Sequence, residues 1–145
     1  VEVNVQQFER VIAKTEQVLG GPVDGRTVAV WGLTFKAGTD DLRDSPAIEI
    51  VNRLVVAGAT VRAYDPEVAE GAAVLDGVEV CADAYAACDG ADALVVLTEW
   101  PEFARVDLDR VAEALTSPAV VDTRNVLDRA ALARRGFAFQ GIGRR

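Results

Sequence analysis

The residues best suited to chemistry in this sequence gather in one stretch, residues 32–46, with the sequence GLTFKAGTDDLRDSP. Two cations stand in this stretch, Lys36 and Arg43. A lysine makes a point contact to a phosphate and an arginine a bidentate one, so the pair could bind an anion. Gly38 and Thr39 offer a flexible backbone and a hydroxyl for close approach by a ligand, and Phe35 offers a ring against which a base or sugar could lie. These residue types favour an anion-binding loop, and an ordinary polar loop with a capping aspartate is the alternative.

The elements around this stretch would place it at the edge of a sheet. Residues 27–33 form a β-branched apolar run, TVAVWGL, which predicts a buried strand. Ser45 and Pro46 make a good N-cap and first-turn pair, which predicts that a helix begins there. The free N–H groups and the dipole of a helix N-terminus favour an anion. Asp40 and Asp41 are predicted to orient the two cations rather than to act as a general acid and base.

Strands and helices alternate along the rest of the chain. Further strands are predicted within residues 59–65, 78–81, 91–98, 119–123 and 137–143, and further helices within residues 67–75, 83–88, 107–115 and 128–136. This alternation predicts a doubly wound, Rossmann-like α/β domain whose parallel sheet is covered on both faces. Such sheets bind ligands beyond the carboxyl ends of their strands. Because the charged loop follows the first strand, it is predicted to lie on that rim.

The charged loop lacks the glycine pattern of a usual dinucleotide site. Gly32 and Gly38 are its only glycines, so no G-x-G-x-x-G follows the first strand, and a P-loop is absent too. An NAD-binding Rossmann domain of the usual kind is therefore disfavoured. Asp65 ends the second strand, where dinucleotide folds place an acid on a ribose hydroxyl. The alternative for Asp65 is a turn before Pro66.

Composition argues against several classes of function. A net charge of -8 disfavours a nucleic-acid partner, since phosphate contacts need a basic surface. No apolar run reaches the roughly 18 residues of a membrane span. The chain has no histidine, and no metal site is predicted. Cys81 and Cys88 are too few for a disulfide framework, which favours a cytoplasmic protein. Both are predicted to be buried structural thiols rather than nucleophiles.

The first 21 residues predict a helix that precedes the α/β domain. The chain has 145 residues, enough for one domain, and contains no methionine. Apolar residues recur at helical spacing, with Thr15 at the one gap, at the following positions: Val1, Val5, Phe8, Ile12 and Leu19. No capping residue precedes this helix. The pattern predicts the end of a long helix in a fragment of a longer protein, and a processed N-terminus is the alternative.

Four segments together resemble one known family. The stretch at residues 32–46 is similar to the opening motif of the UDP-binding domain of the UDP-glucose/GDP-mannose dehydrogenase family. Three further segments agree with this domain in order and spacing: VRAYDP at 61–66, GADALVVLTEWPEF at 90–103, and VVDTRNVLD at 120–128 with GFAFQGIGR at 136–144. The resemblance extends over essentially the whole chain. It implies that residues 1–21 end a central helix between two domains and that residues 22–145 bind a nucleotide sugar.

The resemblance also implies roles for individual residues. Five residues of the loop would line the UDP-sugar site: Phe35, Lys36, Ala37, Gly38 and Thr39. Arg43 would reach NAD, and Arg124 would reach the nucleotide sugar, within its own subunit or across to the partner's site. Thr123 departs from the family's usual glycine, so the backbone near Arg124 could be tighter. Trp31 departs from a small or aliphatic residue and could simply fill the sheet.

The same resemblance implies an NAD-dependent nucleotide-sugar 6-dehydrogenase as the parent enzyme. Such an enzyme oxidises the C6 alcohol of a UDP-sugar to a carboxylate, using two NAD and a covalent cysteine adduct. UDP-glucose is the first choice of substrate. The catalytic cysteine and the main NAD site would belong to an N-terminal domain outside this chain, so the chain alone is predicted to be inactive. The implied assembly is a homodimer built on the first helix. The alternatives are a GDP-mannose or UDP-N-acetylhexosamine 6-dehydrogenase, a stand-alone nucleotide-sugar-binding module, or a dimerising scaffold. Direct ligand contact and packing both remain open for Thr98, Glu99 and Trp100.

Overall fold

A computed structural model of the chain describes residues 3–34 and 45–141, and of residues 3–5 only the backbone. Its helices are α1 (Val3–Leu19), α2 (Pro46–Val56), α3 (Ala84–Cys88), η1 (Pro101–Arg105, a 3₁₀ helix), α4 (Leu108–Ala114) and α5 (Arg129–Arg134). Its strands are β1 (Thr27–Trp31), β2 (Thr60–Tyr64), β3 (Val78–Val80), β4 (Ala93–Val96), β5 (Ala119–Asp122) and β6 (Ala138–Gly141). None of the described helices is long and apolar enough to span a membrane.

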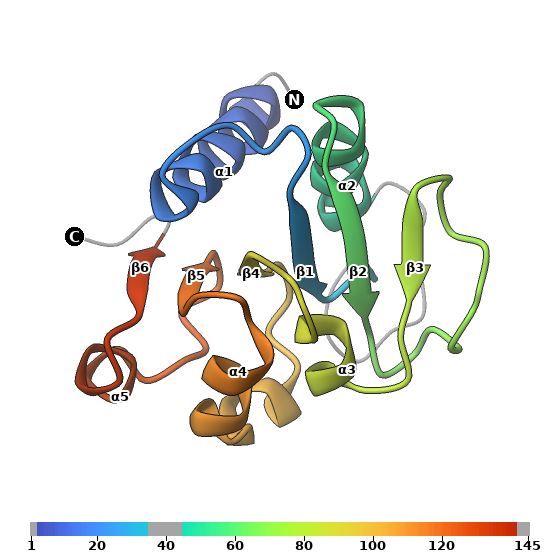
Figure 1. The fold of residues 1–145 in the computed structure, drawn as a ribbon. Coiled ribbons are helices and arrows are strands. Elements are labelled where there is room, and N and C mark those ends of the chain that lie inside the picture. The colour runs from blue at the N-terminus through green and yellow to red at the C-terminus, as the bar shows by residue number, and fades with distance from the viewer. Residues whose placement is uncertain (1–2, 35–44, 142–145) are drawn as a thin grey trace.

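The strands form one parallel sheet in the order β3-β2-β1-β4-β5-β6 (Figure 1). The chain runs outward from β1 in one direction and then from β4 in the other, so the strand order reverses between these two neighbours. Trp31 pairs with Tyr64 of β2 and with Val96 of β4, which aligns the carboxyl ends of the three strands. The predicted doubly wound Rossmann-like fold is confirmed. Ligands of such folds bind at the reversal of strand order, outside the carboxyl ends.

Helices cover both faces of the sheet (Figure 1). Val28 and Val30 of β1 face the side of α1 and α2, whereas Ala29 and Trp31 face the side of α3, α4 and α5. Trp31 is fully buried, donates its indole N–H to the Ala84 carbonyl at 3.0 Å, and lies with its ring centroid 5.2 Å from that of Phe103. The expectation that Trp31 fills the sheet is therefore confirmed.

The buried face of α1 includes the described part of the seam predicted for residues 1–21 and adds Val11 to it. Val11 and Thr15 are its most buried side chains, so Thr15 occupies the seam position at which the apolar pattern is interrupted. The Thr15 hydroxyl donates to the Val11 carbonyl at 2.8 Å, so its polar group is satisfied inside the helix. Phe8, Ile12 and Leu19 are partly buried against the same core. The described part of this seam therefore packs against the chain's own sheet and α2.

The helix predicted for residues 67–75 is wrong. Turns and bends connect β2 to β3 there, and Gly71 and Gly77 adopt positive φ angles of 78° and 85°. An L-residue rarely adopts this conformation, and it breaks a helical run. Val68, Val74 and Leu75 are nevertheless partly buried against the core. Their apolar spacing reflects packing of an irregular segment rather than one face of a helix.

Candidate functional site

The residues that follow the carboxyl ends of β1, β2, β4 and β5 form one edge of the sheet, here called the strand-end rim. It comprises residues 32–34, 65, 97–100 and 122–125. The rim includes the reversal of strand order between β1 and β4. Several polar and charged side chains that sequence reasoning singled out are on it.

Asp65 holds the start of the charged loop in place. It follows β2 directly and is 1% exposed. One carboxylate oxygen accepts hydrogen bonds from the N–H of Leu33 at 2.7 Å and from both the N–H and the hydroxyl of Thr34 at 3.1 Å. The other oxygen accepts from the N–H of Glu67 at 2.8 Å. Because its oxygens are buried and engaged, Asp65 does not offer them to a ribose, and its role is to brace the backbone after β1.

The far end of the charged loop is tied to the same backbone. Ser45 caps α2, as predicted, by accepting from the N–H of Ile48 at 3.4 Å. Its hydroxyl also donates to the Leu33 carbonyl at 2.8 Å. The two ends of the loop therefore meet at Leu33, which fixes where the loop leaves the sheet and where it returns. The loop's predicted site residues lie outside the described residues: Phe35, Lys36, Ala37, Gly38, Thr39, Asp40, Asp41 and Arg43.

Gly32 lets the ends of β1 and β4 approach closely. Its φ is +103°, and a Cβ added there would lie 2.0 Å from Thr98 Oγ1 and 2.8 Å from the Thr98 backbone nitrogen. Thr98 is 2% exposed, and within the described residues its hydroxyl oxygen has no hydrogen-bond partner. Close packing at the reversal of strand order thus accounts for Gly32 and for the burial of Thr98.

The turn after β5 presents Arg124. Asp122 is 2% exposed and accepts hydrogen bonds from the N–H groups of Arg124, Val126 and Leu127 at 3.1, 2.8 and 2.7 Å. Thr123 donates both its N–H and its hydroxyl to the Val96 carbonyl, at 3.1 and 2.7 Å. Thr123 therefore ties β5 to β4, and its hydroxyl adds a hydrogen bond that a glycine at this position could not make.

The side chain of Arg124 reaches across to the end of β4. Its Nε donates to Oε1 of Glu99 at 2.9 Å. Both side chains are about half exposed, at 48% and 44%. The structure thus brings together two residues that the sequence had marked separately. The two residues are 25 positions apart, so local sequence pattern does not predict their contact. The one indication in the sequence is that each of them follows the end of a strand.

The segment after Glu99 is largely packed into the protein. Trp100 is half-buried, and its indole N–H has no hydrogen-bond partner among the described residues. Phe103 of η1 is fully buried, and Glu102 accepts a hydrogen bond from the Tyr64 hydroxyl at 3.0 Å. The pKa of Tyr64 is raised to about 12, mainly by burial and to a smaller extent by the hydrogen bond to the Glu102 carboxylate. Tyr64 is therefore a neutral donor near the rim over the physiological range.

The two cysteines are buried and unpaired, as predicted. Burial raises the pKa of the Cys88 thiol to about 12 and also raises the pKa of Cys81. A nucleophilic cysteine acts as a thiolate, so neither environment suits this role. Within residues 3–34 and 45–141, no group of three or more His, Cys, Asp or Glu side chains could hold a metal ion.

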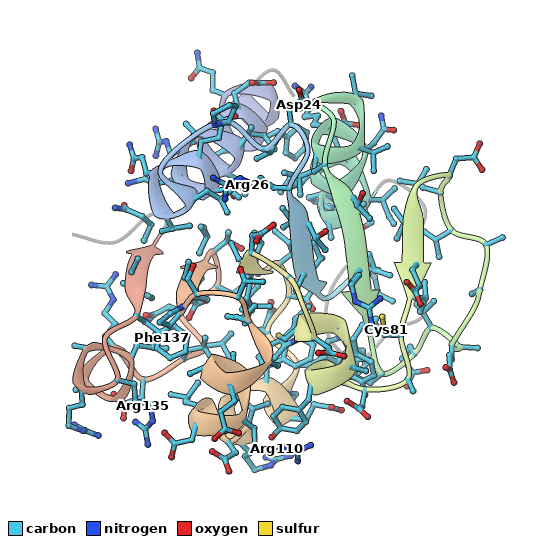
Figure 2. The ribbon with its side chains drawn as sticks, viewed as in Figure 1. Asp24, Arg26, Cys81, Arg110, Arg135 and Phe137 are labelled. Carbon is cyan, nitrogen blue, oxygen red and sulfur yellow. The ribbon has the colours of Figure 1, made fainter. Side chains whose placement is uncertain are left out.

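Other charged groups lie away from the strand-end rim. Figure 2 shows Asp24 and Arg26 beside the start of β1, at the opposite edge of the sheet, and Arg110 on the outer side of α4. Arg110 stacks over the ring of Tyr85, with 3.8 Å between its guanidinium carbon and the ring centroid. Two surface hollows also lie elsewhere, one between α3 and α4 and the other between α1 and α2. Their linings are Asp83, Tyr85, Ala86, Asp89, Arg110, Glu113 and Ala114 for the first and Glu9, Ile12, Asn52, Arg53, Val56 and Ala57 for the second.

Comparison with known proteins yields a consistent set of similarities. The sequence model of the UDP-glucose/GDP-mannose dehydrogenase family, UDP binding domain, matches residues 29–129. A UDP-glucose 6-dehydrogenase of Rhizobium meliloti is 43% identical over 145 residues, covering 99% of this chain and 33% of the relative.

Solved structures agree with this match. A UDP-glucose dehydrogenase from Pyrobaculum islandicum superposes with a TM-score of 0.77 at 31% identity, over 97% of this chain and 30% of that one. A UDP-D-ManNAc dehydrogenase from Pyrococcus horikoshii gives a TM-score of 0.75 at 29% identity, over 96% of this chain and 30% of that one. The chain therefore spans about a third of the length of the relatives it matches.

Proposed function

The chain belongs to the UDP-glucose/GDP-mannose dehydrogenase family and carries its UDP-binding domain, and from that premise we propose that the strand-end rim binds the nucleotide part of a UDP-sugar. The match confirms the resemblance found in the sequence. The observation that carries the location is the convergence of Arg124 and the two ends of the charged loop at one edge of the sheet. That edge contains the reversal of strand order, where doubly wound folds bind their ligands.

The proposed division of labour follows residue types. Lys36 would make a point contact to the diphosphate, and Arg124 a bidentate one, since a planar guanidinium matches the geometry of two phosphate oxygens. Four further loop residues would line the base, the ribose or the sugar: Phe35, Ala37, Gly38 and Thr39. Asp65 and Asp122 support the site through the backbone. Asp65 holds two N–H groups of the rim, and Asp122 holds the N–H of Arg124 and two more in the segment that follows it.

For the whole protein we propose the oxidation of UDP-glucose at C6 with NAD as oxidant. The support is the 43% identity to a protein named as a UDP-glucose 6-dehydrogenase. UDP-N-acetylhexosamine and GDP-mannose remain alternatives, since a UDP-D-ManNAc dehydrogenase shares this fold at 29% identity and the family name includes GDP-mannose. We further propose that residues 1–21 belong to a central helix, that residues 22–145 bind the nucleotide sugar, and that the protein is a cytoplasmic homodimer.

The described residues do not fit a usual NAD site. The glycine fingerprint is missing after β1, and the Asp65 carboxylate is engaged with the N–H groups of Leu33, Thr34 and Glu67. We propose that NAD is held mainly by a domain outside this chain, with Arg43 as a contact from this side. The buried thiols of Cys81 and Cys88 do not supply a nucleophile, so we expect no turnover from this chain alone.

A calorimetric titration of the chain with UDP, GDP, UDP-glucose and NAD tests the proposal. UDP and UDP-glucose should bind, while GDP and NAD should bind at least about tenfold more weakly, because discrimination of one base from another is worth 1.4 kcal/mol or more. Lys36→Ala should weaken UDP binding, and Lys14→Ala is the matched control, because Lys14 is the other lysine of the sequence and donates to Gln140 of β6, which is not a rim residue. Equal affinity for UDP and GDP, or equal loss in both lysine variants, would contradict the proposal.

A further inference from the structure

The ion pair between Glu99 and Arg124 uses only one side of the guanidinium. Nε of Arg124 donates to Glu99 Oε1 at 2.9 Å, and among the described residues neither terminal nitrogen has a hydrogen bond or ion pair. The two terminal nitrogens form the end of the planar fork that matches two oxygens of a phosphate. The contact therefore fixes the direction of the side chain while its anion-binding end stays available.

The backbone under Arg124 is already fixed by hydrogen bonds to β4 and to the end of β5. Thr123 is tied to the Val96 carbonyl of β4 by two hydrogen bonds, and the Arg124 N–H is held by Asp122 at 3.1 Å. Asn125 follows with a positive φ of 60°, which closes the turn. With the backbone held in this way, the rotatable bonds of the Arg124 side chain are the remaining freedom, and within the part of the chain that the structure describes Glu99 is the group that pairs with this side chain.

We propose that Glu99 is a positioning residue that aims the terminal nitrogens of Arg124 at the diphosphate of the nucleotide sugar. This inference rests on the proposed function, in which Arg124 contacts the ligand. An arginine free to rotate must be immobilised when the ligand binds, and ordering one such side chain costs about 0.5–1.5 kcal/mol. Because Glu99 already orders the Arg124 side chain in the unbound protein, ligand binding loses less of this conformational freedom.

Simple electrostatics predicts the opposite effect. A carboxylate near an anionic ligand repels it, so removal of Glu99 would strengthen binding if charge alone mattered. An exposed ion pair with no function would predict little change. Positioning predicts that removal of Glu99 weakens binding although a repulsive charge is lost. The sign of the effect therefore separates the three explanations.

The experiment measures UDP affinity for wild type, Glu99→Ala, Glu99→Gln and Glu113→Ala by calorimetry. Glu99→Ala should weaken UDP binding about three- to tenfold, the effect of one side chain left unordered. Glu99→Gln keeps an oxygen acceptor for Nε without the charge, so it should bind UDP at least as tightly as wild type. Glu113→Ala is the control for loss of one surface charge, because Glu113 lies beside Ala114 at the opposite edge of the sheet. It should leave UDP affinity unchanged.

A second background shows whether Glu99 acts through Arg124. Arg124→Lys removes Nε and the fork while keeping the charge, so adding Glu99→Ala to it should cause no further loss of UDP affinity. A similar loss in both backgrounds, or UDP binding by Glu99→Ala at or above the wild-type level, would overturn the inference while the proposed function stood. If wild type did not bind UDP, the proposed function would fail, and the inference with it. The denaturant midpoints of Glu99→Ala and wild type should coincide, so a lowered midpoint would count against a positioning role.

Discussion

Replacing Asp65 by asparagine tests how the fold positions the charged loop. Asparagine has the same shape but only one acceptor oxygen. Three donors from Leu33 and Thr34 converge on one oxygen of Asp65, and the N–H of Glu67 is held by the other. If the amide oxygen takes the place facing Leu33 and Thr34, the amide NH₂ faces the N–H of Glu67. Two donors then oppose each other.

The expected cost of Asp65→Asn is about 2–4 kcal/mol of the free energy of unfolding. Hydrogen bonds to a charged acceptor contribute about 1.5–3 kcal/mol each and neutral ones about 1. Weakening three bonds and losing a fourth would cost about 4 kcal/mol, from which the smaller desolvation penalty of a neutral amide is subtracted. Asp65→Ala should cost more, because it leaves the buried N–H groups of Leu33 and Thr34 without this acceptor. Against a total stability of about 5–15 kcal/mol, both effects are large.

Urea unfolding followed by tryptophan fluorescence measures this prediction. Asp128→Asn is the matched control, since Asp128 is an exposed N-cap of α5 that accepts from Ala130 and Ala131. Asparagine is as good an N-cap as aspartate, so its cost should stay below about 0.5 kcal/mol. A cost for Asp65→Asn within about 1 kcal/mol of zero, or equal to that of the control, would refute the bracing role.

Three further outcomes follow from the geometry. Gly32→Ala should lower the free energy of unfolding in urea by about 3 kcal/mol, because of backbone strain at φ +103° and the clash with Thr98. Gly20→Ala, at φ +77° with open space around the added Cβ, should lower it by only about 1 kcal/mol. Equal costs would contradict the close approach of β1 and β4. The Cys88 thiol, whose pKa burial raises to about 12, should resist a disulfide reagent at neutral pH until the chain unfolds; rapid labelling of the native chain would show that it is accessible. The pKa of Tyr64 is raised from 10.0 to about 12. The neutral side chain therefore contributes its full stabilisation below pH 10.0, and this contribution is lost as the pH rises toward about 12. In an ultraviolet titration, Tyr64→Phe should remove the tyrosine transition at the highest pH, and loss of a transition near pH 10 would contradict the shift.

The sequence predicted the elements whose signals are local. The segments of β1, β4 and β5 are continuous apolar runs rather than alternating apolar and polar residues, and each forms a buried strand. Ser45 and Pro46 marked the start of α2 correctly, because the N-cap bond spans three residues of one segment. Alternation of such strands with helices was enough to predict the doubly wound sheet.

Predictions failed where tertiary contacts override local pattern. Apolar residues of the 67–75 segment pack against the core at near-helical spacing, yet Gly71 and Gly77 take positive φ angles and the segment turns. Val11 of α1 is buried although it lies outside the predicted seam, and its carbonyl accepts the hydroxyl of Thr15, which lets a threonine occupy a buried seam position.

The candidate site was predictable in position but not in its connections. The described ends of the charged loop, Thr34 and Ser45, lie at the carboxyl edge of the sheet, as expected of a loop that follows β1, and Arg124 lies at the same edge. The bracing role of Asp65 depends on donors 31 and 32 positions earlier in the chain, and the Glu99–Arg124 pair on two strands that meet only in the sheet. The roles of Phe35, Lys36, Ala37, Gly38, Thr39 and Arg43 stay predictions, because they lie outside the described residues.

The most direct test of the central claim is to map UDP onto the chain by backbone amide NMR. The account predicts that the shifts caused by UDP concentrate on the strand-end rim and the adjoining charged loop, with Leu33, Glu99 and Arg124 among the residues affected. Shifts confined to the hollow between α3 and α4, or to the hollow between α1 and α2, would contradict it, because neither belongs to the carboxyl edge of the sheet.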